Sequence, residues 1–400
     1  MHISIFLGPF ARGPRDDRPL IDWCLRGAEQ AAADGFAMVT FGEQHFNNYE
    51  PYCNPLLMGA RLAPVLGDAW FATTVLPLPY HNPIRLAEDL NALDQLLSGK
   101  LIAGMSAGRI GFSPDFENFG LDPKQQRAIY AEKMAALKTL WTHTQDDGPL
   151  AFTGDWVKGG MHGRLMPVSY RSPHPHIAIG SNTDATVRQA GVDGNILFLG
   201  PCPLEDAAAK LDLFRHGLVA GGHDPAVIED RIDKSMVHHQ FVVADTDDAA
   251  WAQIERMMPF HPLMDRREDK RSFRQMQDDG LSEKPGTPVE KANELVVRGW
   301  MVAGSPQTVI DVIKAHGDAG LKMVHTRFGF GPYNPELWDR NYKMFVGSVL
   351  PHVDCTPLEA VRPHEMQPAV IAGAAPIGGP PTQSMGIAAK DSPEPARRTG

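Results

Sequence analysis

Short apolar segments alternate with amphipathic segments along most of this chain, and this alternation limits the possible folds more than any other feature. Eight apolar segments predict β-strands, and the stretches between them have the spacing of surface helices. The predicted strands are His2–Leu7, Phe36–Phe41, Trp70–Leu76, Leu101–Ser106, His176–Ile179, Asn195–Leu199, Ser235–Ala244 and Met323–Phe328. Because strands that alternate with helices form parallel sheets, eight such units predict an α/β fold, the TIM (β/α)8 barrel. An open dinucleotide-binding sheet is disfavoured, since no GxGxxG motif follows the first strand.

Three segments interrupt this alternation. Phe152–Val157 and Arg164–Val168 predict a small hairpin between the fourth and fifth barrel strands. Pro259–Arg298, before the eighth strand, is highly charged and contains several prolines, so we expect an insertion that forms a mobile lid. Residues 355–400 are rich in Pro, Gly and Ala and bury too little apolar surface to offset their ordering entropy. The chain is therefore expected to form one barrel domain over residues 1–354, followed by a disordered C-terminal tail.

Charge and cysteine content disfavour several classes of protein. The 400 residues have a net charge of −10, with 38 basic and 48 acidic side chains, which argues against nucleic-acid binding through phosphate neutralisation. No apolar stretch has the length of a membrane span. Cys24, Cys53, Cys202 and Cys355 form no CxxC pair, so neither a disulfide framework nor a thiolate zinc site is expected. Met1–Leu7 lacks the basic region of a signal peptide and predicts a strand, which together favours a cytoplasmic protein.

The active site of a TIM barrel lies at the carboxyl ends of its strands, so the residues that follow each strand are the candidates. Gly42-Glu43-Gln44-His45-Phe46 follows the second strand. It offers either an acid/base pair beside a cofactor or a buried polar pair that caps the local backbone. Pro77–Pro83 follows the third strand and predicts a rigid turn into the next helix. Gly104–Arg109 follows the fourth strand, and its two glycines would let a flat ligand approach the backbone.

The fifth strand is followed by Gly180–Thr186, which has a glycine, hydroxyl groups and a helix start. This pattern is typical either of an anion site at a helix N-terminus or of an ordinary N-cap. Arg127, early in the helix after Pro123, could bind a phosphate or could be solvated. His238 and His239 are neighbours on a strand and face opposite sides, and no HExxH motif is present, so no metal is expected.

Several short motifs stand in a characteristic order. They are Gly35-Phe36, Gly42–Phe46, Leu78-Pro79, Asn82–Asp89, Leu93–Leu96, Ser98-Gly99-Lys100, Asp115-Phe116 and Phe119-Gly120, with Gly304-Ser305-Pro306 and Phe345–Pro351 near the end. This ordered set resembles the bacterial luciferase-like, flavin-dependent monooxygenases over residues 1–353. The resemblance implies that reduced FMN, delivered by a separate flavin reductase, binds in the barrel mouth and reacts with O₂ to a C4a-peroxyflavin. That species oxygenates a small-molecule substrate. A homodimer is also expected.

The resemblance assigns roles to the residues after the second and third strands. Glu43 matches a glutamate near the flavin ring, and His45 matches the second histidine of a Glu-His-His triplet. Gln44 replaces the first histidine, and since an amide cannot act as a base at neutral pH, light emission is not expected. Thr74-Val75 matches a non-proline cis peptide under the flavin ring.

Further cofactor residues are expected at the fourth and fifth strands. Arg127 matches a phosphate-binding arginine, and Ser181 matches a serine that contacts the phosphate. Ala107 stands where luciferase has a second such arginine, for which Arg109 is a possible substitute. Ser106 and Gly180 complete the expected cofactor residues, without a metal.

Two alternatives remain open at this level. Some relatives use the deazaflavin F420 for hydride transfer without oxygen, although Glu43 and His45 favour FMN. The chain could also be a catalytically silent flavin-binding subunit, although such a subunit lacks a complete mouth.

Overall fold

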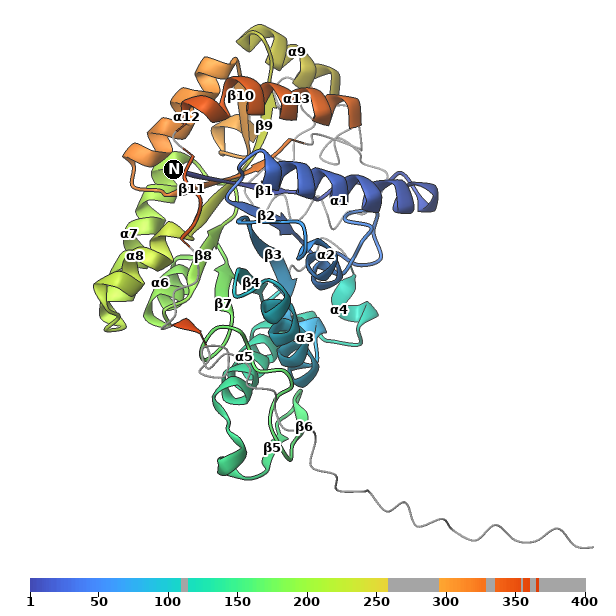
Figure 1. The fold of residues 1–400 in the computed structure, drawn as a ribbon, viewed down its shortest axis with the longest axis vertical. Helices are drawn as coiled ribbons and strands as arrows, with labels where there is room; N and C mark the ends of the chain where they lie inside the picture. Colours follow the sequence, from blue (N-terminus) through green and yellow to red (C-terminus); the bar gives the residue numbers. More distant parts are fainter. Residues whose placement is uncertain (109–113, 258–294, 329–334, 354, 360–364, 367–400) are drawn as a thin grey trace, which may run out of the picture.

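The computed structural model describes residues 1–108, 114–257, 295–328, 335–353, 355–359 and 365–366. Eight parallel strands close into a barrel and helices surround it (Figure 1), so the prediction of a TIM barrel is confirmed. The barrel strands are β1 (His2–Phe6), β2 (Met38–Phe41), β3 (Trp70–Pro77), β4 (Leu101–Ser106), β7 (His176–Gly180), β8 (Ile196–Leu199), β9 (Met236–Val243) and β11 (Met323–Arg327). β11 pairs with β1 and β9, and β8 pairs with β9, which closes the cylinder.

The helices lie between successive strands, on the outside of the barrel. Those described are α1 (Asp17–Ala33), α2 (Pro55–Leu62), α3 (Pro83–Leu96), α4 (Asp115–Asn118), α5 (Gln126–Thr142), α6 (Asp184–Val192), α7 (Leu204–Ala220), α8 (Pro225–Asp233), α9 (Asp247–Met257), α12 (Pro306–Asp318) and α13 (Pro335–Ser348). Three of them begin with a side-chain cap and a proline. Asn54 Oδ1 accepts hydrogen bonds from the first turn of α2, Asn82 Oδ1 does so for α3, and Ser305 Oγ does so for α12.

The barrel interior is packed with side chains at its amino-terminal end. The inward-facing residues there form one apolar cluster, which includes Met38, Trp70, Ala72, Ile102, Ala178, Ile196, Phe198, Met236 and Met323. A second and larger cluster fills the space between the strands and the outer helices. Each fully buried large apolar side chain contributes about 1.5–3 kcal/mol to folding. Buried polar residues also lie within the barrel strands, among them Thr40, Thr73 and His325.

Two small strand elements differ from the predictions. β10 (Met301–Gly304) pairs with the second half of β9, although the sequence predicts no strand there. It has only four residues and ends in glycine, so it lacks a readable strand pattern. The hairpin is present, but its arms are β5 (Leu150–Thr153) and β6 (Lys158–Met161), so the predicted second arm is wrong. The β6 sequence, Lys-Gly-Gly-Met, has no β-branched residue, so it lacks the composition that predicts a strand.

The chain beyond the barrel makes contacts that its composition does not predict. Leu358 is buried, and Arg171 forms an ion pair with Glu365 and a β-bridge with Met366. These described parts of the tail pack on the barrel, and the rest of the tail lies outside the described residues. Residues 258–294, which contain most of the predicted lid, also lie outside them. The insertion itself falls between β9 and β11, before the eighth barrel strand, as expected.

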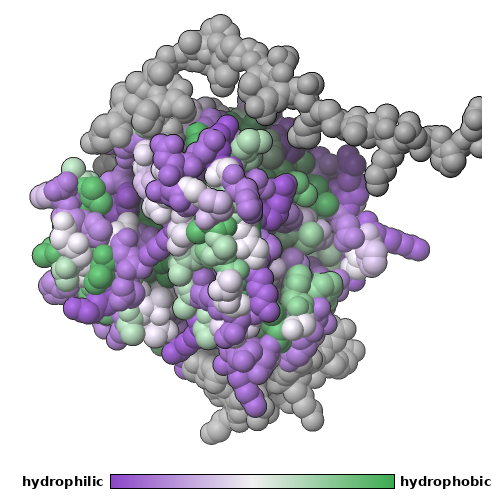
Figure 2. Space-filling view, turned by 90° about the horizontal axis from the view of Figure 1, so that it is seen from below, coloured by the Kyte–Doolittle hydropathy of each residue, from purple (hydrophilic) through white to green (hydrophobic). Residues whose placement is uncertain are grey.

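The surface is mixed in character. Figure 2 shows one face, on which hydrophilic residues predominate and hydrophobic residues form scattered patches. Within the ranges that the structure describes, every helix is too short or too polar to cross a membrane.

Candidate active site

A carboxylate flanked by two histidines lies at the carboxyl end of the barrel. Glu43 follows β2 directly and is only 7% exposed. Its Oε1 lies 2.7 Å from His45 Nε2, and both of its carboxylate oxygens lie 2.9 Å from His81 Nε2. His81 comes from the segment between β3 and α3, so the parallel pairing of β2 with β3 brings two neighbouring strand ends into one site.

The two histidines keep Glu43 ionised in spite of its burial. Burial raises the pKa of Glu43, but the hydrogen bonds from His45 and His81 outweigh that effect and hold its pKa below the usual value. A carboxylate accepts hydrogen bonds and cannot donate them, so each histidine donates through its Nε2. The Nδ1 of each neutral ring is then its proton acceptor. The cluster therefore joins one carboxylate and two imidazoles, which are the groups that acid/base catalysis uses.

An aromatic wall stands beside this cluster. Tyr80 stacks on Phe119 with ring centroids 4.8 Å apart, and His45 meets Phe119 edge-on at 4.9 Å. Phe116 also packs edge-on against Tyr80. Phe119 therefore packs directly against the His45 ring, and Tyr80 and Phe116 support Phe119 from behind in a continuous set of ring contacts.

The expected cofactor residues of three strands gather at the same end of the barrel. The Thr74-Val75 peptide, within β3, is cis, as the resemblance implies. A Cβ on Gly180, at the end of β7, would lie 3.0 Å from Val75 Cγ1, so these residues are direct neighbours. Ser106 ends β4, pairs with Pro77 of β3, and accepts a hydrogen bond from the Gly108 amide at 3.1 Å. These residues are half-buried and carry small side chains or none, so a flat ring such as a flavin could approach the backbone beside them.

The expected phosphate residues are accessible but do not touch one another in any contact that the structure shows. Arg127 is exposed on the first turn of α5. Ser181 follows β7 and accepts a hydrogen bond from the Thr183 amide at 3.1 Å. No side chain caps the start of α6, so the amide groups of its first turn keep their donors for another group. A shared anion position for Arg127 and Ser181 stays a prediction, and Arg109 lies outside the described residues.

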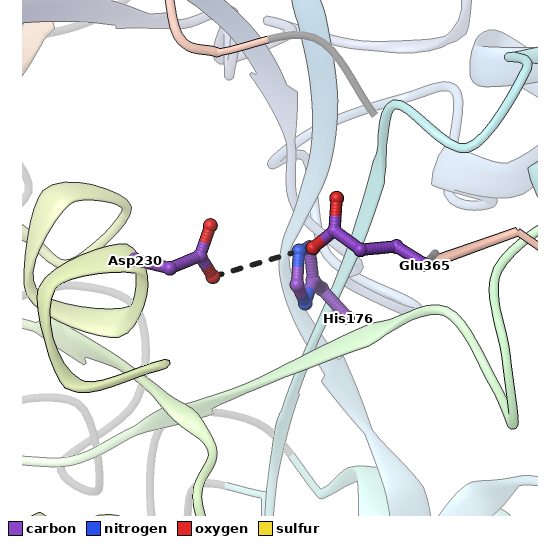
Figure 3. A group of neighbouring side chains, drawn as sticks. All are labelled: His176, Asp230 and Glu365. Atoms are coloured by element: carbon purple, nitrogen blue, oxygen red, sulfur yellow. Dashed lines mark ion pairs between the residues drawn. The ribbon is translucent and has the colours of Figure 1, made fainter. Parts of the chain in front are cut away.

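A second polar cluster lies at the opposite, amino-terminal end of the barrel. His176 begins β7 and points toward Asp230 and Glu365, with possible metal-ligand atoms within 4.8 Å of one another (Figure 3).

The carboxylates of this cluster are already paired with cations. Arg171 Nη2 lies 2.6 Å from Glu365 Oε1, and Asp230 is bonded by Arg231 and Lys234. Burial and the same cations hold the pKa of His176 well below its usual value. A metal ion would have to displace these bonds beside three positive charges, so we assign the cluster as a buried ion-pair network.

The family can now be assigned. A model of the luciferase-like monooxygenases matches residues 1–323. The chain belongs to this family. Among curated relatives, 2,5-diketocamphane 1,2-monooxygenase 1 of Pseudomonas putida is 28% identical over 165 residues, which are 41% of this chain and 44% of that protein. The matched stretches span 44% to 50% of the length of three such relatives, about half or less.

Two solved structures show the same barrel. The oxygenating constituent of 3,6-diketocamphane monooxygenase from Pseudomonas putida, a type II Baeyer-Villiger enzyme in complex with FMN, has a TM-score of 0.68. It is 21% identical and covers 89% of this chain and 100% of its own. An F420-dependent secondary alcohol dehydrogenase in complex with an F420-acetone adduct has a TM-score of 0.64 at 16% identity, and covers 88% and 98%.

His81 is the site residue that the sequence does not reveal. The Pro77–Pro83 segment is indeed a turn into α3, but the histidine within it also contacts Glu43. Its position directly after a barrel strand was the available signal, since both partners of the cluster follow neighbouring strands. Gln44, by contrast, is half-exposed and lies beside Asn47, whose Nδ2 donates to it at 3.4 Å.

Proposed function

We propose that this protein is a flavin-dependent monooxygenase that uses reduced FMN and O₂ to oxygenate a small organic substrate. The observation that carries the proposal is the buried Glu43 carboxylate between His45 and His81, at the barrel end that also holds Thr74, Val75 and Gly180. Reduced flavin, when bound, supplies the electrons that activate molecular oxygen. Family membership and the FMN complex of a structural relative support the choice of cofactor.

The residues of this chain would position the flavin ring, exclude water from it and transfer protons. Thr74, Val75, Ser106 and Gly180 would bind the ring, and Glu43 would fix the two histidine rings. Each ring can hold a proton at Nδ1 while its Nε2 proton stays on the Glu43 side. The stacked Tyr80 and Phe119 would limit the entry of water to the reacting centre.

We also propose that a separate reductase delivers the reduced flavin. The part of the chain that the structure describes forms one barrel with a short hairpin and contains no second, dinucleotide-binding sheet. A relative of the same fold is called the oxygenating constituent of its monooxygenase, which supports a two-component system.

Hydride transfer from F420 is the second candidate, because one structural relative binds that cofactor. The two functions differ in their use of oxygen. Purified full-length protein should be given FMN, NADH and a generic flavin reductase, and oxygen uptake should be recorded with a panel of cyclic ketones, terpenoids and aldehydes. We expect substrate-dependent uptake together with a product heavier by one oxygen atom. Reduction of a ketone by reduced F420, without oxygen uptake above that of the reductase alone, would contradict the proposal.

Arg127→Ala should weaken reduced FMN binding about tenfold and leave riboflavin binding unchanged. An arginine that forks onto a phosphate contributes charge-assisted hydrogen bonds that riboflavin cannot receive. Dissociation constants can be measured by anaerobic fluorescence titration. Lys124→Ala is the matched control, since it removes another exposed cation just before α5. Equal weakening of both flavins by Arg127→Ala, or equal effects of the two variants, would remove Arg127 from the phosphate site.

A further inference from the structure

A chain of side-chain hydrogen bonds runs from the barrel mouth into the closed interior. Thr74 is half-buried at the mouth, and its hydroxyl donates to Thr40 Oγ1 at 3.1 Å. Thr40 is completely buried, and its Oγ1 lies 2.8 Å from His325 Nε2. The three residues come from β3, β2 and β11, which lie in one run of neighbouring strands, β11-β1-β2-β3, so residues far apart in the sequence meet inside the barrel.

The direction of the outer hydrogen bond follows from its geometry, in which Thr74 is the donor. A threonine hydroxyl has one proton and two lone pairs. Thr40 accepts the proton of Thr74, and its own proton is available to His325 Nε2 in the tautomer of the ring that carries its proton on Nδ1. The hydroxyl of Thr74 therefore donates its proton toward the barrel interior, and only its lone pairs are left to face the mouth.

The surroundings of His325 keep this arrangement in place. The ring packs against Phe6 and against His238, with centroids 5.9 Å and 4.8 Å away, and the residue is 3% exposed. Burial, with a smaller contribution from His239, lowers the pKa of His325 to about 3. The ring is therefore neutral under physiological conditions and has one nitrogen that can accept a hydrogen bond.

We propose that His325 and Thr40 act as positioning residues that make Thr74 a hydrogen-bond acceptor and thereby favour reduced over oxidised flavin. The inference rests on the proposed flavin function. Reduction of a flavin by two electrons and two protons converts ring nitrogens that accept hydrogen bonds into N–H donors. An acceptor at the mouth matches the reduced ring, whereas it faces a lone pair of the oxidised ring. A buried donor or acceptor without a partner is costly, so the chain discriminates between the two redox forms.

The test is the ratio of the dissociation constants of oxidised and reduced FMN, measured anaerobically on the full-length protein. We expect wild type to bind the reduced form more tightly. Thr40→Val removes the acceptor for Thr74 at almost constant volume, so Thr74 can turn its proton to the mouth. The ratio should then fall about two- to tenfold, the range of one hydrogen bond. For a two-electron couple, this corresponds to a drop of about 9 to 30 mV in the midpoint potential of the bound flavin.

Matched variants separate this effect on the ratio from a general disturbance of the barrel interior. Thr326→Val removes another fully buried threonine hydroxyl, which donates to Ser4 O at 2.8 Å outside the chain, and it should leave the ratio unchanged. Thr40→Ser keeps the hydroxyl and should keep the wild-type ratio. His325→Phe should lower the ratio like Thr40→Val, and it serves in its place if that variant does not fold.

Three results would count against the inference in distinguishable ways. A wild-type ratio in the folded Thr40→Val or His325→Phe protein would overturn it, and so would an equal change in Thr326→Val. If wild type bound neither form of FMN, the proposed function would fail, and this inference with it.

Discussion

Replacement of Glu43 by glutamine is expected to reduce substrate-dependent oxygen uptake by about 10²- to 10⁴-fold, the usual contribution of an acid/base group. Glutamine has nearly the same volume, but it offers one acceptor oxygen and an NH₂ donor in place of two acceptor oxygens. In the wild-type protein, His45 and His81 both donate to the Glu43 carboxylate. In the variant, at least one of these N–H groups would face the NH₂ group of the glutamine, which is also a donor. Both rings would also lose the shared carboxylate that fixes their orientation.

The measurement is the initial rate of oxygen uptake and of oxygenated product at saturating reduced FMN. Reduced FMN binding should change by less than threefold, because Glu43 holds the histidines rather than the phosphate. Glu117→Gln is a suitable control, since Glu117 is exposed on α4 near the same mouth. His45→Asn and His81→Asn should each be impaired, and the double variant should lose less than the product of the two, because the three residues act as a unit. A Glu43→Gln enzyme with wild-type turnover would show that the cluster is only structural.

The barrel was predictable because local pattern and global topology agree in this chain. Each long barrel strand has an apolar run that ends at a turn signal, and each outer helix has one buried face, so alternation alone implies a parallel sheet. β10 was not predicted because four residues are too few to show the alternating pattern of a strand. Its pairing with β9 is imposed by tertiary structure. The contacts of Leu358 and Glu365 were not predicted either. The prediction for the tail used its overall composition, which cannot show that single residues in it have specific partners.

The site was predictable only as far as the position of strand ends allows. The rule that function lies at the carboxyl ends of barrel strands places Glu43 and His45 at the mouth. It cannot pair Glu43 with His81, which is 38 positions away, or Thr40 with His325, which is 285 positions away. Those contacts depend on strand register and on side-chain direction within the barrel, and neither can be predicted from a local stretch of sequence.

A second large effect is expected at Glu50, a buried carboxyl group that the proposed chemistry does not use. Glu50 follows the Glu43–Phe46 segment and is 6% exposed, and its Oε2 has no hydrogen-bond partner among the described residues. A Cβ built on Gly42 would lie 2.5 Å from that oxygen, so backbone encloses the group closely. Burial raises the pKa of Glu50 to about 8, with a smaller rise from Glu43 and an opposing effect of Arg327.

The sign of the resulting pH dependence is fixed by proton counts. Unfolded Glu50 loses its proton near pH 4.5, whereas the folded protein keeps it up to about pH 8. Between these values the native state binds more protons than the unfolded state, so this group lowers the free energy of unfolding as pH rises. The stabilisation is complete below about pH 4.5 and is lost by about pH 8. At about 1.4 kcal/mol per pH unit, the loss between pH 5 and pH 8 amounts to about 4 kcal/mol.

Glu50→Gln removes this titration while it keeps the shape of the side chain, so the variant should gain stability relative to wild type as pH rises. Urea unfolding at pH 5, 6, 7 and 8 should give a difference in unfolding free energy that grows by about 4 kcal/mol in favour of the variant. All other titrating groups are shared by the two proteins and cancel in this difference. Glu29→Gln, an exposed change on α1, should give a difference that does not vary with pH. Parallel stability curves for wild type and Glu50→Gln would mean that Glu50 is ionised in the folded protein, held so by Arg327 despite its burial.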